Sequence, residues 1–322
     1  MEPNNLKEPF SLRCILFVKD VCLPNVFPAT TIVLIALSLL SFIVPNVASS
    51  FIFKATLVVG SAYGASFILY FITPYLPEKV QNFIGYIIPF FKELVVMGLL
   101  ATIYFKDLSK NNSKKIPAEG DPLIIIICGY LHNSSGALNL QYEIEKQTGI
   151  PVRCIDPENL LESIEDHAKN LVSEIEIAEE QIGKRDIILI GHSMGGIISL
   201  VYAFNKGKSK VKDIITLSAP SKGTKLANIG FGKCAEEMRK NSNLIKELNE
   251  NSKKDHGIRI LQIGLKNDLI VPLKSAFLEG VPKENKRTIS DMGHTEILLD
   301  NEAIGMVTEH IRTHYRHHSI KI

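Results

Sequence analysis

A single serine stands between two glycines in the segment Gly191-His192-Ser193-Met194-Gly195. An apolar run typical of a strand, residues 186–190, precedes this segment, and an apolar run typical of a helix, residues 196–204, follows it. A sharp strand–turn–helix junction needs residues without Cβ atoms two positions before and after the serine, and the two glycines meet this need. The pattern predicts a nucleophile elbow, in which the serine would attack a carbonyl carbon.

A serine hydroxyl becomes a strong nucleophile only when a neighbouring base takes its proton, and an acid must hold that base in one tautomer. The chain offers both groups downstream of Ser193. Asp268 follows a predicted strand at residues 258–264, and His294 follows a short predicted strand at residues 287–290. The order serine, aspartate, histidine therefore predicts a catalytic triad.

Two other aspartates compete for the role of the acid. Asp291 is close in sequence to His294, and Asp255 precedes the strand that leads to Asp268. We favour Asp268 because it stands in the loop at the carboxyl end of that strand, and we expect Asp291 on the approach to the His294 loop.

These motifs resemble those of a known family. Residues 121–316, about 60% of the chain, are similar to an α/β-hydrolase of the lipase and esterase branch, and in particular to the bacterial lipases. The resemblance rests on the elbow and on the stretches Ile124–Leu131, Leu217–Thr224, Met238–Leu248, Asn267–Pro272 and Gly293-His294. It implies a mostly parallel sheet with helices on both faces, hydrolysis of carboxylic esters, and no cofactor or metal ion.

The resemblance also implies an oxyanion hole made of backbone N–H groups. Family members commonly have His-Gly-hydrophobe after the first long core strand, whereas this chain has Cys128-Gly129-Tyr130. Because the donors are backbone groups, the missing histidine side chain removes no donor. The N–H groups of Tyr130 and Met194 are expected to face the oxyanion, and Leu131 would replace Tyr130 if the loop is displaced by one residue.

The residues around the elbow alternate between strand and helix patterns. Strands are expected at residues 123–128 and 152–155, and helices at residues 136–148 and 157–182. This alternation also favours a mostly parallel sheet that is covered on both faces.

The segment 221–257 is the only large insertion in this pattern. Its apolar residues Leu244, Ile245 and Leu248 stand among many charges. We expect a solvated helix that packs one face on the domain, with an interfacial lid as the alternative.

The first 105 residues differ in composition from the rest. No charged residue lies between Asp20 and Lys54, a run of 33 residues, or between Lys54 and Glu78, a run of 23. A helix that spans a membrane needs about 20 apolar residues, so spans are expected at residues 30–48 and 55–74. A cleaved signal peptide is disfavoured because the first apolar stretch starts late and a second one follows.

A third span at residues 83–105 is possible, although Lys92-Glu93 places charges at its centre. With two spans, nine Lys and Arg residues flank one side of the membrane and Lys54 alone the other. With three spans, four Lys and Arg residues would flank one side of the membrane and five the other, so the charges would not determine the orientation of the chain. The charges favour a hairpin with both ends cytoplasmic, with residues 83–105 as an interfacial or re-entrant segment. A linker at residues 106–121 and a catalytic domain at residues 122–322 follow this anchor.

Composition argues against several other functions. A net charge of +2 with 22% charged residues gives no indication of nucleic-acid binding. The five scattered cysteines without a C-x-x-C pair suit free thiols in a reducing compartment. His310 and His314 stand four residues apart on a predicted terminal helix and could bind a metal ion, but no carboxylate or cysteine is expected to complete the set, so a solvated helix end is expected.

The sequence thus predicts a membrane-anchored serine hydrolase that cleaves carboxylic esters of lipid-like substrates. An acyltransferase or a thioesterase would use the same triad and the same acyl-enzyme. A catalytically silent membrane scaffold is the alternative from another class. No protein partner is indicated by the sequence.

Overall fold

The computed structural model describes Glu78 and residues 116–315, apart from Leu131, Asn133, Pro157, Glu158, Leu160, residues 206–209 and Asp291. The chain divides into two units, Met1–Leu108 and Ser109–Ile322, and all described residues except Glu78 belong to the second. The predicted membrane segments at residues 30–48, 55–74 and 83–105 lie outside the described residues. Within the described residues, no helix combines the length and apolar character that a membrane span requires.

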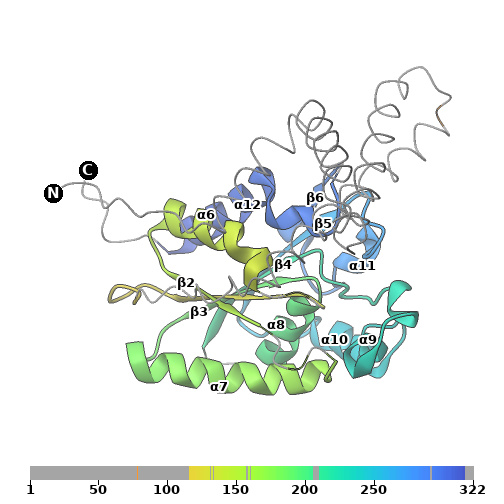
Figure 1. Ribbon diagram of the computed structural model, residues 1–322, viewed down its shortest axis with the longest axis horizontal. Helices are drawn as coiled ribbons and strands as arrows, with labels where there is room; N and C mark the ends of the chain where they lie inside the picture. Colours follow the sequence, from red (N-terminus) through yellow and green to blue (C-terminus); the bar gives the residue numbers. More distant parts are fainter. Residues whose placement is uncertain are drawn as a thin grey trace, which may run out of the picture. The chain divides into compact units, whose positions relative to one another are not determined.

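Six strands form one sheet in the order β2-β1-β3-β4-β5-β6, and every neighbouring pair is parallel (Figure 1). The strands are β1 Leu123–Ile127, β2 Val152–Ile155, β3 Ile187–His192, β4 Val211–Leu217, β5 Arg259–Leu265 and β6 Lys286–Ile289. Because all six run in one direction, their carboxyl ends meet at a single edge of the sheet.

Helices cover both faces of this sheet (Figure 1). The α-helices of the described residues are α6 Leu138–Thr148, α7 Ile164–Ile182, α8 Met194–Asn205, α9 Gly232–Glu237, α10 Asn243–Asn251, α11 Leu273–Ala276 and α12 Asn301–His314. Helices α6 and α12 lie on one face, and α7 and α8 lie on the other. The predicted mostly parallel sheet with helices on both faces is therefore confirmed.

The burial of strand β1 on both faces explains why its sequence is an unbroken apolar run. Leu123, Ile125 and Ile127 belong to the core cluster that contains α7 and α8. Ile124 and Ile126 belong to the cluster that contains α6 and α12. A strand that is buried on both faces must be apolar at every position, unlike a strand with one solvated face.

Two helices begin at different residues from those expected. Helix α7 begins at Ile164 rather than at residue 157, because Ser163 caps it by accepting a hydrogen bond from the Asp166 N–H at 3.1 Å. Helix α8 begins at Met194, two residues earlier than expected, so the helix follows Ser193 without a connecting residue.

The insertion at residues 221–257 contains α10, which buries Ile245 and Leu248 and packs the half-buried Leu244 against the α7–α8 core. The expected packing of one helical face on the domain is therefore present in α10.

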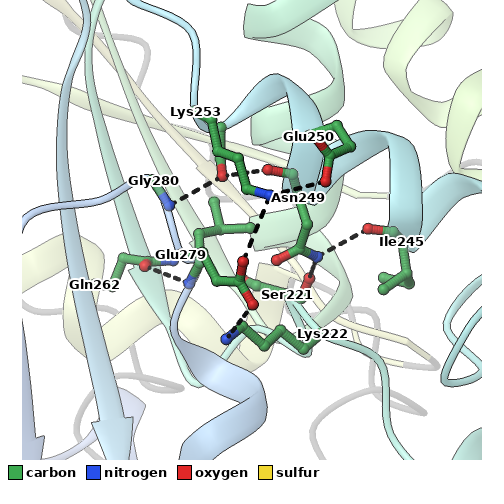
Figure 2. A network of polar contacts seen from close by, with 11 residues as sticks. Ser221, Lys222, Ile245, Asn249, Glu250, Lys253, Gln262, Glu279 and Gly280 are labelled. Carbon is green, nitrogen blue, oxygen red and sulfur yellow. Dashed lines mark hydrogen bonds and ion pairs between the residues drawn. The ribbon is translucent and has the colours of Figure 1, made fainter.

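Polar contacts fix this part of the insertion to the rest of the domain (Figure 2). Within the insertion, the Asn249 side-chain amide donates a hydrogen bond to the Ser221 carbonyl at 2.8 Å. The Glu279 carboxylate pairs with Lys222 at 3.4 Å and with Lys253 at 3.6 Å. Since these ion pairs are solvent-exposed, they position the segments more than they stabilise the fold.

A buried carboxylate ties β4, β5 and the end of α12 together. Arg259 donates to both oxygens of Asp213 at 2.8 and 2.7 Å, the Tyr315 hydroxyl donates at 2.7 Å, and His310 Nε2 lies at 2.9 Å. Burial alone would raise the pKa of Asp213, but the contacts with His310, Arg259 and Tyr315 outweigh burial and lower that pKa to about 2. The ionised form of Asp213 is therefore favoured by the folded state.

Asp213→Asn should lower the free energy of unfolding at neutral pH by about 1–3 kcal/mol, because the substitution removes the charge that its donors solvate. An ordinary Asp pKa in the unfolded chain is about 4, so the contribution of Asp213 is present above that pH and is lost between about pH 4 and pH 2. Chemical denaturation at several pH values would measure both effects. Glu247→Gln, at an exposed position of α10, is the control. Equal stability of the Asp213 variant and the control would contradict this account.

Candidate functional site

Ser193 lies on the tight turn between β3 and α8 and has a left-handed backbone with φ of 52°. This conformation is uncommon for a residue with a Cβ atom and is held here by the surrounding backbone. The Ser193 N–H donates to the Leu217 carbonyl at 2.9 Å, and the Gly196 N–H donates to the Ser193 carbonyl at 3.0 Å. The serine is therefore fixed at the carboxyl edge of the sheet.

The glycines on either side allow this close packing. A Cβ atom at Gly191 would overlap the backbone of Gly195 and Gly196, and one at Gly195 would overlap the carbonyl groups of Ile127 and Cys128. Both contacts involve backbone atoms, which a rotamer change cannot relieve. The first turn of α8 can approach β1 only because these positions lack side chains.

Asp268 and His294, in the loops after β5 and β6, meet at the same edge. His294 Nδ1 lies 2.7 Å from Asp268 Oδ2, which also accepts a hydrogen bond from the Ser218 hydroxyl at 2.8 Å. Asp268 Oδ1 accepts from the N–H groups of Ile270 and Val271, both at 2.8 Å. Both oxygens of the carboxylate are thus occupied and its orientation is fixed.

Asp268 and His294 are both buried, with about 5% of each residue exposed. Burial by itself raises the pKa of Asp268, but the nearby His294, the Val271 N–H and the Ser218 hydroxyl outweigh burial and lower the pKa below its ordinary value. Asp268 is therefore ionised at neutral pH, and it can orient the imidazole and stabilise a positive charge on it.

His192 connects the elbow with the His294 loop, although sequence reasoning did not select it. Its Nε2 lies 3.1 Å from the His294 carbonyl oxygen, and the two imidazole rings are 4.9 Å apart between centroids. Since a carbonyl only accepts, this contact places the proton of a neutral His192 on Nε2. The residue next to Ser193 in sequence thus holds the main chain of His294.

The histidines around His294 are uncharged at neutral pH. Burial, together with His294 and His132, lowers the pKa of His192 well below its ordinary value. Burial and His294 lower the pKa of His132 to about 4, and the His132 ring lies 5.8 Å from the His192 ring. A proton accepted by His294 would therefore meet no second positive imidazole at neutral pH.

The loop after β1 passes directly beside the serine. A Cβ atom at Gly129 would lie 3.0 Å from Ser193 Cβ and 3.2 Å from His192 Nδ1, which is tighter than ordinary packing. Tyr130, the next residue, is a predicted oxyanion donor. Met194, the other predicted donor, is the first residue of α8, and the first N–H groups of a helix have no partner within it. The Leu131 alternative lies outside the described residues.

Ser218 is a second residue that the sequence analysis did not assign to the site. It is fully buried and left-handed, with φ of 46°, and its N–H donates to the Ile263 carbonyl at 2.8 Å. The sequence feature that could have indicated Ser218 is a polar residue directly after a buried strand.

Of the competing aspartates, Asp255 accepts a hydrogen bond from the Gly257 N–H in its own loop at 2.8 Å, and Asp291 lies outside the described residues.

One expectation about metal ligands needs correction. Asp213, which is distant in sequence, joins His310 and His314, and one ligand atom from each lies within 4.8 Å of the others. A carboxylate therefore does complete the set that the sequence left incomplete. Both oxygens of Asp213 already accept hydrogen bonds from Arg259, and a guanidinium so close disfavours a second cation. This arrangement suits an ion-pair network better than a metal site.

Comparisons with known proteins support the fold of the described domain. Residues 158–317 match the family described as PGAP1-like alpha/beta domain. The mature lipase BlEst2 of Bacillus licheniformis superimposes with a TM-score of 0.51 and 17% identity, over 61% of this chain and 94% of that one. Aspergillus fumigatus lipase B superimposes with a TM-score of 0.50 and 14% identity, over 61% and 55% of the two chains. No curated protein sequence matches the chain. The described domain therefore has the α/β-hydrolase fold that lipases and esterases also have.

Proposed function

We propose that this protein is a membrane-anchored serine hydrolase that cleaves carboxylic esters of lipid-like substrates. The observation that carries the proposal is the 2.7 Å contact between His294 Nδ1 and the Asp268 carboxylate at the sheet edge that bears the Ser193 elbow. A buried, ionised acid that orients an imidazole, at the edge of the sheet that carries a serine on an elbow, has a known chemical use in acyl transfer.

In the proposed reaction, Ser193 Oγ attacks the ester carbonyl carbon while His294 Nε2 accepts the hydroxyl proton. Asp268 holds the imidazole through Nδ1 and stabilises its positive charge. The tetrahedral intermediate collapses when the C–O bond breaks and His294 gives its proton to the leaving alcohol. Water then attacks the acyl-enzyme by the same steps, which releases the carboxylic acid and restores Ser193.

The N–H groups of Tyr130 and Met194 are the proposed donors to the negative charge on the substrate oxygen. Gly129 supports this role because its backbone passes beside Ser193 at a distance that leaves little room for a side chain. Loss of one such donor typically costs about 10²–10³ in kcat.

Hydrolysis of esters is favoured over other acyl transfers by the two lipase structures that share the fold. An acyltransferase or a thioesterase would form the same acyl-enzyme and would differ only in the acceptor or the leaving group. A silent scaffold would not need a buried acid held by four donors, as Asp268 is. Product analysis with water as the only acceptor distinguishes hydrolysis from transfer.

The proposed membrane attachment rests on the long uncharged runs before residue 78. Two spans at residues 30–48 and 55–74 would place the hydrolase domain in the cytoplasm, on the side that carries most of the Lys and Arg residues. Attachment to a bilayer is the reason to propose lipid-like rather than water-soluble esters as substrates.

Ser193→Ala should abolish labelling by a fluorophosphonate probe and lower ester hydrolysis by about 10⁶-fold, because the nucleophile is absent. Ser199→Ala is a matched control, since Ser199 is a buried serine on α8, the helix that follows Ser193, and its hydroxyl donates to the Gly195 carbonyl at 2.8 Å. Labelling and initial rates on a short ester measure the effect. Retained labelling in the Ser193 variant would refute the assigned nucleophile.

Asp268→Asn should lower kcat by about 10⁴-fold, because an amide at this position favours the wrong tautomer of His294. Asp255→Asn and Asp291→Asn should retain most of the activity. Steady-state kinetics on the same short ester would test all three variants. If Asp291→Asn is the most damaging of the three, the acid has been assigned to the wrong residue.

A hairpin anchor should keep both ends of the chain on the cytoplasmic side. The full chain should remain with membranes after an alkaline wash, and a C-terminal tag should resist external protease in intact cells. Digestion of that tag would instead support three spans and catalysis on the opposite side of the membrane.

A further inference from the structure

Large apolar side chains are exposed around the edge that carries the candidate site. They are Leu161 after β2, Leu226, Ile229 and Phe231 after β4, and Leu269 after β5. Ile229 and Phe231 are each 74% exposed. Because all strands are parallel, the loops that carry these side chains leave the same edge of the sheet as Ser193 and His294.

The loop that contains three of them, residues 225–233, has a fixed backbone. It lies between Thr224 and Arg239, which form a β-bridge at the base of the segment. Ala227 and Cys234 are buried in the α7–α8 core cluster. The exposed side chains therefore belong to a loop whose backbone is held in place by buried residues.

Two further contacts hold the outer part of this loop. The Tyr130 hydroxyl donates to the Phe231 carbonyl at 2.9 Å and accepts from the Phe231 N–H at 3.0 Å. The Lys233 N–H donates to the Leu161 carbonyl at 3.0 Å. Since Tyr130 is a proposed oxyanion residue, the main chain of Phe231 is joined to the loop that lies beside Ser193.

The charges on loop 225–233 identify its occupant. Lys225 and Lys233 are exposed at its two ends, and no acidic residue lies between them. Apolar side chains flanked by lysines suit an anionic lipid surface, because the side chains enter the acyl region while the ammonium groups remain among the headgroups. A stable protein interface buries about 800 Å² on each partner, which is more than these five partly exposed side chains supply.

We propose that loop 225–233 inserts Leu226, Ile229 and Phe231 into an anionic lipid surface. This contact places the carboxyl edge of the sheet, with Ser193, at the level of the lipid headgroups. That a lipid is hydrolysed there rests on the proposed function, whereas the contact of the loop with lipid is independent of catalysis.

The chain contains no tryptophan, so Phe231→Trp supplies a single fluorescent reporter at the centre of the loop. The full chain carrying Ser193→Ala and Phe231→Trp is reconstituted into vesicles of phosphatidylcholine with about 30% phosphatidylserine. Its emission should shift to shorter wavelength, and brominated acyl chains should quench it about twofold or more. Because the variant lacks the nucleophile, this result does not depend on whether the protein is a hydrolase.

Ile177→Trp in the same background is the matched control. Ile177 is a 48% exposed apolar residue in the last third of α7, which runs back toward the amino edge of the sheet. Its emission should remain that of tryptophan in water and should not be quenched. Adding Lys225→Glu to the Phe231 reporter should weaken quenching in anionic vesicles, because it reverses one of the two flanking charges.

Three results would overturn the proposal. Emission at the wavelength of tryptophan in water, without quenching, would show that the loop does not enter lipid. Blue-shifted emission that brominated lipids do not quench would show that protein covers the loop. Equal quenching in vesicles of phosphatidylcholine alone would contradict the role of Lys225 and Lys233.

Discussion

The parallel direction of all six strands is the constraint on which the candidate site depends. It brings the ends of strands that are distant in sequence to one edge, so that each loop contributes one or two polar groups. At this edge the Asp268 carboxylate has its own four donors, and His192 holds the main chain of His294. Precise placement of side chains thus comes from hydrogen bonds between loops that the sheet has already brought together.

The fold was predictable because strands buried on both faces leave a clear apolar signal. Runs such as Ile124–Ile127 and residues 187–190 identified β1 and β3, and the glycines around Ser193 identified the turn. The residues that the sequence did not identify act through long-range contacts. Ser218 and His192 bond to residues 50 and 102 positions away, and Asp213 meets His310 across 97 positions. Such partners have no fixed spacing, so no local pattern reveals them.

The ionisable groups of the site differ in their charge at neutral pH. Hydrogen bonds keep Asp268 charged despite its burial, whereas burial keeps His192 and His132 neutral. Of these three groups beside the His294 imidazole, only the Asp268 carboxylate is therefore charged, and its charge is negative. This arrangement would favour a proton on His294, as the proposed role of a general base requires.

The distance along the chain between the elbow and its histidine also has a consequence for biosynthesis. A ribosome releases β3 and Ser193 long before it releases His294, whose main chain bonds to His192 across 102 positions. Strand β6, which leads to His294, lies at the border of the sheet and is the last strand among the described residues. A nascent chain can thus complete its central strands before the proposed base of Ser193 has been made. Under the proposed function, Ser193 would gain its base only after β6 and the loop that follows it have been made.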